Sequence, residues 1–205
     1  SNFIHIKLNT INKTVNTIVC FTNYQKSILI DLGIKEKLIS IKPNTSNINS
    51  NTIPWKQRKN KVSFIGRLDN EKGIAELIEI WNLDEKLPIL EICGDGPLLE
   101  ILKNQYNNVE NIVFLGYLKG DDLVNRIKNS KAIIVPSRRW EGYPMVIADA
   151  IKLKIPVIGS NVGPMKELCK NIGVSINFNN KIDSLNEIYK LIEKEFEKLN
   201  SNYNE

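Results

Sequence analysis

Short apolar runs alternate with segments of helical periodicity along most of this 205-residue chain. The runs that favour strands are Val62–Gly66, Pro88–Cys93, Ile112–Gly116, Ala132–Pro136, Ile155–Ser160 and Gly173–Ile176. Helices are expected at 74–81, 98–105, 121–128, 144–153, around Glu167, and after an N-cap at Asp183. Strands that are apolar throughout lie in parallel sheets covered by helices on both faces. The sequence therefore predicts an α/β fold, a Rossmann-like doubly wound parallel sheet, whose ligands bind at the carboxyl ends of the strands.

The N-terminal part of the chain differs in character from the remainder. Residues 17–21, 25–32 and 38–41 are typical of a strand, a helix and a strand, which together make one isolated βαβ unit. A unit of this size buries too little apolar surface for a core of its own. We therefore expect three segments: 1–42 as the remnant of an N-terminal domain that is mostly missing here, 43–61 as a polar linker, and 62–205 as the ligand-binding domain.

Composition and charge exclude several classes of protein. Hydrophobic residues at 42% and charged residues at 25% are ordinary globular values, which exclude wholesale disorder and a coiled coil. The apolar runs are far shorter than the ~20 residues that span a bilayer. The net charge of +5 comes mostly from lysines that alternate with acids, so we expect a solvated surface and no nucleic-acid partner. The three cysteines follow no metal or disulfide spacing, which indicates buried free thiols in a reducing compartment.

A first candidate site is Gly66-Arg67-Leu68-Asp69-Asn70-Glu71-Lys72-Gly73, where a strand end runs into a helix start. Arg67 and Lys72 flank a turn whose following helix offers free N–H groups and a positive dipole end, an arrangement that suits phosphate. Solvated pairs with Asp69 and Glu71 explain the two cations equally well. The pattern GxxxxGK[ST] is absent, which argues against a P-loop nucleotide hydrolase.

A second candidate site is Ser137-Arg138-Arg139-Trp140-Glu141-Gly142-Tyr143-Pro144, between a strand and the next helix. Gly142 lets the backbone approach a ligand closely, and Pro144 suits a first helical turn. The carboxylate of Glu141 can accept hydrogen bonds from sugar hydroxyls. Asp149 lies on the helix, just over one turn in, from where it can point to the same pocket. An acidic first turn that complements the helix dipole explains Asp149 but not Glu141. The pattern therefore favours a binding site.

A third segment, Gly94-Asp95-Gly96-Pro97, is a weak signal by itself, because Gly-Asp-Gly turns after strands are common and GxGxxG is not completed. The single histidine, His5, lies near the N-terminus. No metal-ligand set and no Ser/His/Asp triad can be assembled in the main domain.

These segments in their order resemble the donor-binding domain of the retaining GT-B glycosyltransferases of the group 1 family. The resemblance rests on GRLxxxKG, then GDGP, then Phe114–Leu118, then PS…EGYPMVIADA…IPVIGSNVG, and it covers roughly residues 12–200. Residues 20–44 are similar to the end of the N-terminal domain of that family. The ordered set is far more specific than any one of its motifs.

The resemblance implies a role for each matching residue. Arg67 and Lys72 would hold the diphosphate of a nucleotide sugar and stabilise the departing nucleoside diphosphate. Glu141 would bind the sugar hydroxyls and complete the implied catalytic set. Asp149 would contact the ribose, and the backbone around 117–118 would contact the base. The implied donor-binding residues are Gly66, Arg67, Lys72, Gly94, Tyr117, Leu118, Glu141, Gly142, Tyr143, Pro144 and Asp149, with no metal and no cofactor besides a UDP- or GDP-sugar donor.

The implied function is retaining hexosyl transfer to a glycan or lipid-linked acceptor, in cell-surface polysaccharide biosynthesis. We expect a cytoplasmic location, with peripheral contact at the inner face of the membrane as an option for the intact enzyme. One departure concerns Asp149, where the family has a glutamate, because aspartate is shorter by roughly 1.5 Å. A chain that mostly lacks the N-terminal acceptor domain is expected to bind donor but to be inactive alone. A sugar-nucleotide epimerase of the same fold and a non-catalytic nucleotide-sugar-binding module remain alternatives.

Overall fold

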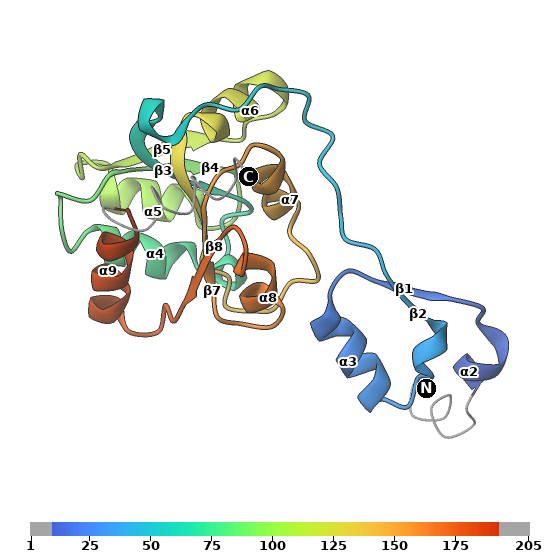
Figure 1. Cartoon of the computed structure of the whole chain (residues 1–205). Helices are drawn as coiled ribbons and strands as arrows, with labels where there is room; N and C mark the ends of the chain where they lie inside the picture. The colour runs from blue at the N-terminus through green and yellow to red at the C-terminus, as the bar shows by residue number, and fades with distance from the viewer. Residues whose placement is uncertain (1–9, 193–205) are drawn as a thin grey trace.

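A computed structural model describes residues 10–192 of the chain, so residues 1–9, with His5, and 193–205 lie outside the described part. The chain forms a small N-terminal unit and a larger α/β unit, joined by an extended segment (Figure 1). In the described part no helix is long and apolar enough to cross a membrane.

The larger unit is built on a six-stranded parallel sheet with the strand order β5-β4-β3-β6-β7-β8. The strands are β3 (Lys59–Ile65), β4 (Ile89–Cys93), β5 (Ile112–Gly116), β6 (Ser130–Val135), β7 (Val157–Ser160) and β8 (Gly173–Ile176). The chain starts in the middle, runs outward to β5, and returns to the other side of β3. This reversal places a topological switch point between β3 and β6. The predicted doubly wound parallel sheet is confirmed.

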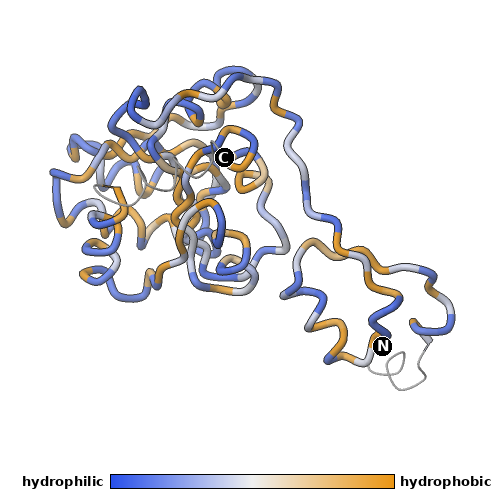
Figure 2. The backbone as a smooth tube through the Cα atoms, viewed as in Figure 1, coloured by the Kyte–Doolittle hydropathy of each residue, from blue (hydrophilic) through white to orange (hydrophobic). Residues whose placement is uncertain are grey.

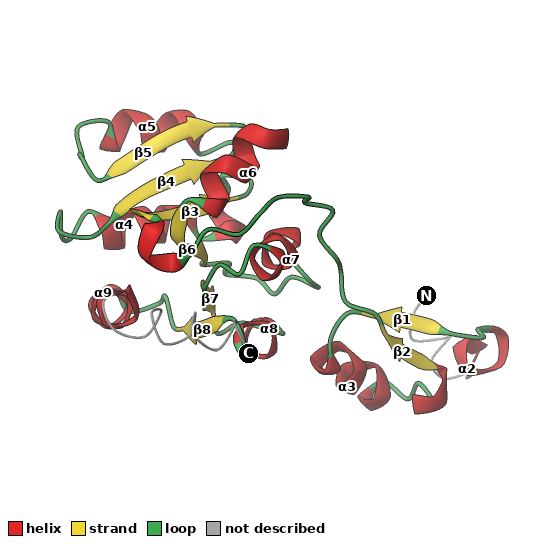
Figure 3. Ribbon diagram, turned by 45° about the horizontal axis from the view of Figure 1, so that its top comes forward, coloured by secondary structure: helices red, strands yellow, loops and turns green. Residues whose placement is uncertain are grey.

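Helices cover both faces of this sheet (Figure 3). One core contains apolar residues of α4 (Ile74–Trp81), α5 (Leu99–Tyr106) and α9 (Lys181–Lys190). The other contains those of α6 (Gly120–Lys128), α7 (Met145–Lys152) and α8 (Met165–Cys169). Successive side chains of β6 pack alternately in the two cores: Ile134 lies in the core with α4, α5 and α9, and Ile133 lies in the other. Figure 2 shows these apolar stretches running through the interior of the larger unit.

Several expected helix starts differ from the structure by one to three residues: α5 and α6 begin at Leu99 and Gly120, each one residue from the expected start. Asp183 is not the N-cap of the last helix: α9 begins at Lys181, and the side chain of Asn180 accepts hydrogen bonds from the amides of Ile182 and Asp183 at 3.1 and 3.3 Å. Asparagine and aspartate both favour the N-cap position, and Asn180 occupies it because the helix begins about one turn before Asp183. Pro144 precedes α7 as its N-cap residue and is not in its first turn.

The N-terminal unit has the predicted βαβ arrangement. Strand β1 (Ile18–Cys20) pairs in parallel with β2 (Ile39–Ile41), and α3 (Asn23–Asp31) connects them. A short helix, α2 (Thr10–Thr14), precedes the first strand. Thr22 caps α3 by accepting a hydrogen bond from the amide of Gln25. The thiols of Cys20, Cys93 and Cys169 are free and buried, as the sequence predicts.

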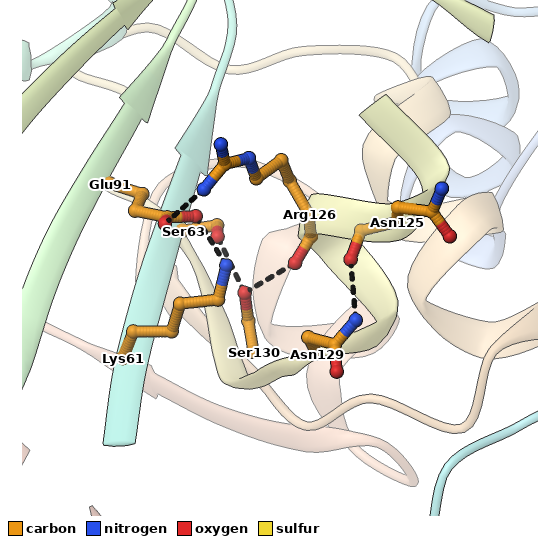
Figure 4. A network of polar contacts seen from close by, with 7 residues as sticks. All are labelled: Lys61, Ser63, Glu91, Asn125, Arg126, Asn129 and Ser130. Atoms are coloured by element: carbon orange, nitrogen blue, oxygen red, sulfur yellow. Dashed lines mark hydrogen bonds and ion pairs between the residues drawn. The ribbon is translucent and has the colours of Figure 1, made fainter. Parts of the chain in front are cut away.

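A buried charge network ties α6 to the sheet (Figure 4). Nζ of Lys61 on β3 lies 2.5 Å from one carboxylate oxygen of Glu91 on β4, and Nη1 of Arg126 on α6 lies 3.0 Å from the other. The hydroxyls of Ser63 and Ser130 lie 2.6 Å apart beside the pair. Because both oxygens of Glu91 are bonded, the carboxylate is paired despite its burial.

Candidate functional site

The carboxyl ends of β3 and β6 flank the switch point, and the two strongest sequence motifs follow these strands. The first loop leaves β3 at Gly66 and forms a 3₁₀ turn, Asn70–Lys72, before α4. Asp69 caps this turn, since its carboxylate accepts a hydrogen bond of 3.0 Å from the amide of Lys72. The second loop runs from Pro136 to α7. Ligands of doubly wound sheets bind in this crevice, so the fold itself points to these two loops.

The two loops lie in direct contact. Gly73 has a φ of +69°, and a Cβ there would lie 2.2 Å from the carbonyl oxygen of Pro136. The amide of Arg138 also donates a 2.8 Å hydrogen bond to the carbonyl of Glu71. A residue without a side chain is thus required where the loops meet. The contact brings Lys72 next to the second loop.

Lys72 and Glu141 form an ion pair across the two loops. Nζ of Lys72 lies 2.5 Å from Oε2 of Glu141, and the hydroxyl of Ser137 donates a hydrogen bond to Oε1. Both charged side chains are partly exposed, at 32% and 23%, so a ligand can reach them. A cation and an acceptor carboxylate are therefore held side by side at the switch point.

A small cavity of about 300 Å³ opens at this ion pair. It is lined by Lys72, Ser137 and Glu141 of the two loops and by residues of α7, Asp149 among them. The start of α7 contributes backbone amides and the positive end of a helix dipole, which favour an anion. Asp149 lies on α7 and accepts a 2.6 Å hydrogen bond from the hydroxyl of Ser46 in the linker.

A larger cavity of about 930 Å³ adjoins the first, and both are lined by Ile65 and Leu123. Five of the residues that the sequence singles out line this larger cavity: Gly66, Arg67, Gly94, Tyr117 and Leu118. The Arg67 side chain is 70% exposed, with Nε 3.5 Å from Asp69, and Tyr117 is 73% exposed. The volume of this larger cavity lies in the range of small-molecule sites, which is ~300–1,000 Å³.

The glycines of the Gly94–Pro97 turn are required by packing. A Cβ on Gly94 would lie 1.8 Å from the carbonyl oxygen of Gly66, and one on Gly96 would lie 2.5 Å from that of Leu68. The amide of Leu68 donates to the carbonyl of Asp95 at 2.9 Å. The turn thus packs directly against the start of the Arg67 loop and forms the floor of the larger cavity.

Cys93 also lines the larger cavity, and its thiol stays protonated. Burial, reinforced by the neighbouring charge of Glu91, raises the pKa of Cys93 to about 11. A thiol with such a pKa is a poor nucleophile at neutral pH. Cys93 therefore acts as an apolar wall residue.

Gly142 and Tyr143 face the N-terminal unit, and neither lines the two cavities. A Cβ on Gly142 would lie 3.0 Å from Nε2 of Gln25. The Tyr143 ring makes an edge contact with Phe21 at 6.4 Å between centroids, and burial raises the pKa of its hydroxyl. Pro144 has no N–H to offer, and its side of the loop lines the small cavity.

The structure brings most of the singled-out residues to one edge of the sheet. Lys72, Glu141, Pro144 and Asp149 share the small cavity, and Arg67 lies at the larger one. Sequence reasoning missed Ser46 and Ser137. Ser137 stands in the segment quoted for the second site, whereas Ser46 carries no signal in its Asn-rich linker. Among residues 10–192, no group of acidic, histidine or cysteine side chains is arranged to hold a metal ion.

Comparison with known proteins identifies the family. A model described as "Glycosyl transferases group 1" matches residues 46–205. The O-antigen biosynthesis glycosyltransferase WbnH of Escherichia coli is 34% identical over 167 residues, which are 74% of this chain and 43% of that protein. A UDP-Gal:alpha-D-GlcNAc-diphosphoundecaprenol alpha-1,3-galactosyltransferase of E. coli is 27% identical over 181 residues, 78% of this chain and 46% of that protein. This chain spans half or less of the length of the curated relatives it matches.

Solved structures agree on the fold. Anabaena HepE in complex with UDP matches with a TM-score of 0.80 at 19% identity, over 97% of this chain and 61% of that one. The apo form of the lipopolysaccharide outer core galactosyltransferase WaaB matches with a TM-score of 0.72 at 20% identity, over 91% of this chain and 56% of that one. Both are GT-B proteins with Rossmann-like domains, so the predicted fold is confirmed. The family model covers the whole larger unit and both site loops, and the chain belongs to the glycosyl transferases group 1 family.

Proposed function

We propose that this chain is the donor-binding half of a glycosyltransferase that takes a nucleotide-diphosphate sugar as its donor. Family membership supports transfer of a sugar. One relative whose name specifies UDP-Gal, and neighbours solved with UDP or UDP-glucose, support a nucleotide sugar. We assign the donor to the two adjoining cavities at the switch point.

The observation that carries the proposal is the Lys72–Glu141 ion pair at the meeting of the two loops. The larger cavity has room for a nucleoside, with the base beside Tyr117 and Leu118. The diphosphate would then reach Arg67, Lys72 and the first amides of α7. The sugar would enter the small cavity, where Glu141 accepts hydrogen bonds from its hydroxyls.

The same contacts suit the chemistry of transfer. Breaking the bond between the sugar and the diphosphate leaves extra negative charge on the departing phosphate. Arg67 and Lys72 would stabilise that charge more in the transition state than in the ground state, which is the requirement for catalysis. Transfer with retention of the anomeric configuration and a hexose as the transferred unit are part of the proposal.

The acceptor is proposed to be a glycan or a lipid-linked sugar in cell-surface polysaccharide synthesis. The names of the E. coli relatives, which specify O-antigen biosynthesis and a diphosphoundecaprenol-linked acceptor, support this choice. Such an acceptor would bring the reaction to the cytoplasmic face of the membrane. The acceptor would dock against a further domain, of which the unit with β1, α3 and β2 is one part.

Calorimetric titration of the chain with UDP, GDP and their sugars tests the donor site. One charged hydrogen bond supplies about 1.5–3 kcal/mol, and micromolar affinity needs about 8 kcal/mol, so the site must act as an ensemble. Arg67→Ala and Glu141→Ala should each weaken binding roughly 10- to 150-fold. Lys181→Ala removes an exposed cation on α9, remote from the cavities, and should leave affinity unchanged.

Three results would overturn parts of the proposal. Failure of every nucleotide to bind at about millimolar concentration would refute the donor site itself. Unchanged affinity in both Arg67→Ala and Glu141→Ala would show that the nucleotide binds elsewhere. Hydrolysis or epimerisation of the bound sugar nucleotide without an acceptor would favour an epimerase over a transferase.

A further inference from the structure

The linker between the two units lies on the larger one as an extended strap with one face buried. Asn44, Ser46 and Ile48 are half-buried, whereas Thr45 and Asn47 between them are exposed. The Asn44 side-chain amide donates a 3.0 Å hydrogen bond to the carbonyl of Tyr143. Ile48 packs against the core under α6 and α7. This alternation is that of an extended chain held at every second residue.

Ser46 makes two hydrogen bonds at the centre of this strap. Its hydroxyl donates to Oδ1 of Asp149 at 2.6 Å and accepts from the amide of Ile48 at 3.1 Å. The second bond fixes the hydroxyl toward α7. The strap therefore holds the Asp149 carboxylate through the hydroxyl of Ser46.

Asp149 lies where two cavities meet. It lines the small cavity that holds the ion pair, and also a cavity of about 680 Å³ between residues 47–50 and the first turns of α6. Leu123 lines both of these and the larger nucleotide cavity as well. Among the described residues only Ser46 is hydrogen-bonded to the Asp149 side chain, so the second carboxylate oxygen of Asp149 remains available to a ligand. A carboxylate can accept about four hydrogen bonds.

We propose that Ser46 is a positioning residue of the donor site: it fixes Asp149 so that the free oxygen accepts a hydrogen bond from a ribose hydroxyl. The inference rests on the proposed function, because it needs a nucleotide in the adjoining cavities. Aspartate has one fewer rotatable bond than glutamate but reaches about 1.5 Å less far. Its orientation therefore decides whether the ribose contact forms, and the strap sets that orientation.

Calorimetry with UDP and 2′,3′-dideoxy-UDP tests this role on the full chain, with the GDP pair used instead if GDP is the nucleotide that binds. Ser46→Ala should weaken binding of UDP about 3- to 10-fold, the share of one hydrogen bond, and leave binding of the dideoxy nucleotide unchanged. Ser46→Thr keeps the hydroxyl and should restore the affinity. Thr45→Ala, at the exposed neighbour, is the matched control and should affect neither ligand.

The outcomes separate the inference from the proposed function. An equal loss for both nucleotides in Ser46→Ala would show that the strap has only a structural role and would overturn the inference. Full affinity for UDP in Ser46→Ala would overturn it as well. If the unaltered chain binds neither UDP nor GDP, the proposed function fails first and the inference falls with it.

Discussion

Replacing Glu91 by glutamine tests how far the larger unit depends on its buried charge network. The side chains of Lys61 and Glu91 are only 6% and 9% exposed, and their charged atoms lie 2.5 Å apart. Arg126, the second partner, is 47% exposed. Glutamine keeps the size of the side chain but removes its charge, so the ammonium of Lys61 is left buried against a neutral amide.

The expected loss in the free energy of unfolding follows from the burial of the two partners of Glu91. Removing one member of a buried pair costs about 3–5 kcal/mol, because the remaining charge is uncompensated. The half-exposed contact to Arg126 adds only about 0–1 kcal/mol. For a domain of this size the loss lowers the melting temperature by roughly 6–20 °C. Glu79→Gln is the matched control, since the Lys181–Glu79 pair is 49% and 42% exposed and should contribute less than about 1 kcal/mol.

Urea unfolding followed by circular dichroism and tryptophan fluorescence measures the free energy of unfolding of both variants. Equal losses for Glu91→Gln and Glu79→Gln would refute the reasoning, because burial would then make no difference. A double variant, Lys61→Met with Glu91→Leu, removes both buried charges. Its stability should lie within about 1 kcal/mol of the unaltered chain or above it.

Three further predictions concern other parts of the fold. Gly94→Ala should lower the free energy of unfolding by more than about 3 kcal/mol, because the added Cβ would lie 1.8 Å from a backbone carbonyl oxygen. Gly120→Ala, with φ +57° and open space around the Cβ, should lower it by about 1–2 kcal/mol. Equal losses in urea titrations would contradict this prediction. Burial raises the pKa of Cys169 to about 12, so its thiol should resist a disulfide reagent at about pH 8 until the protein unfolds, and rapid native labelling would contradict this. Burial alone would raise the pKa of Glu167, but hydrogen bonds from Asn23 and Tyr24 lower it below 4.5. The stability gained from this contact should be complete above pH 4.5 and should be lost as the pH falls through the lowered pKa. Glu167→Gln should therefore reduce the loss of stability on acidification. An unchanged pH dependence of stability would contradict this prediction.

The sheet was predictable because its strands carry their signal locally. Every expected strand of the larger unit is present, since runs such as Ala132–Val135 are apolar on both faces and fit only a covered parallel sheet. The ends of elements were less predictable. Strand β7 begins at Val157 because Ile155 still belongs to the turn after α7, where its amide bonds to the carbonyl of Ala150. That bond depends on a left-handed residue, Lys154 with φ 54°, which no local pattern indicates.

The candidate site was predictable where it follows strand ends. Lys72 and Glu141 lie 69 positions apart, yet each follows a strand at the switch point, so the fold brings them together. The bond from Ser46 to Asp149 spans 103 positions and starts in a segment without regular structure. The sequence contains no periodicity that would place this segment on α7. The same holds for the contact of Phe21 with Tyr143, which turns that ring toward the N-terminal unit.

The loop between β6 and α7 presents different residues to two neighbours. Glu141 faces the small cavity, while Trp140 makes an edge contact with Tyr24 of α3 at 5.5 Å. We expect a donor that orders Glu141 to tighten the hold on α3 as well, and a docked α3 must then improve donor affinity by the same factor. Hydrogen exchange at the amides of Asn23 and Tyr24 should slow when donor is added, and unchanged exchange would show that the two faces of the loop are uncoupled.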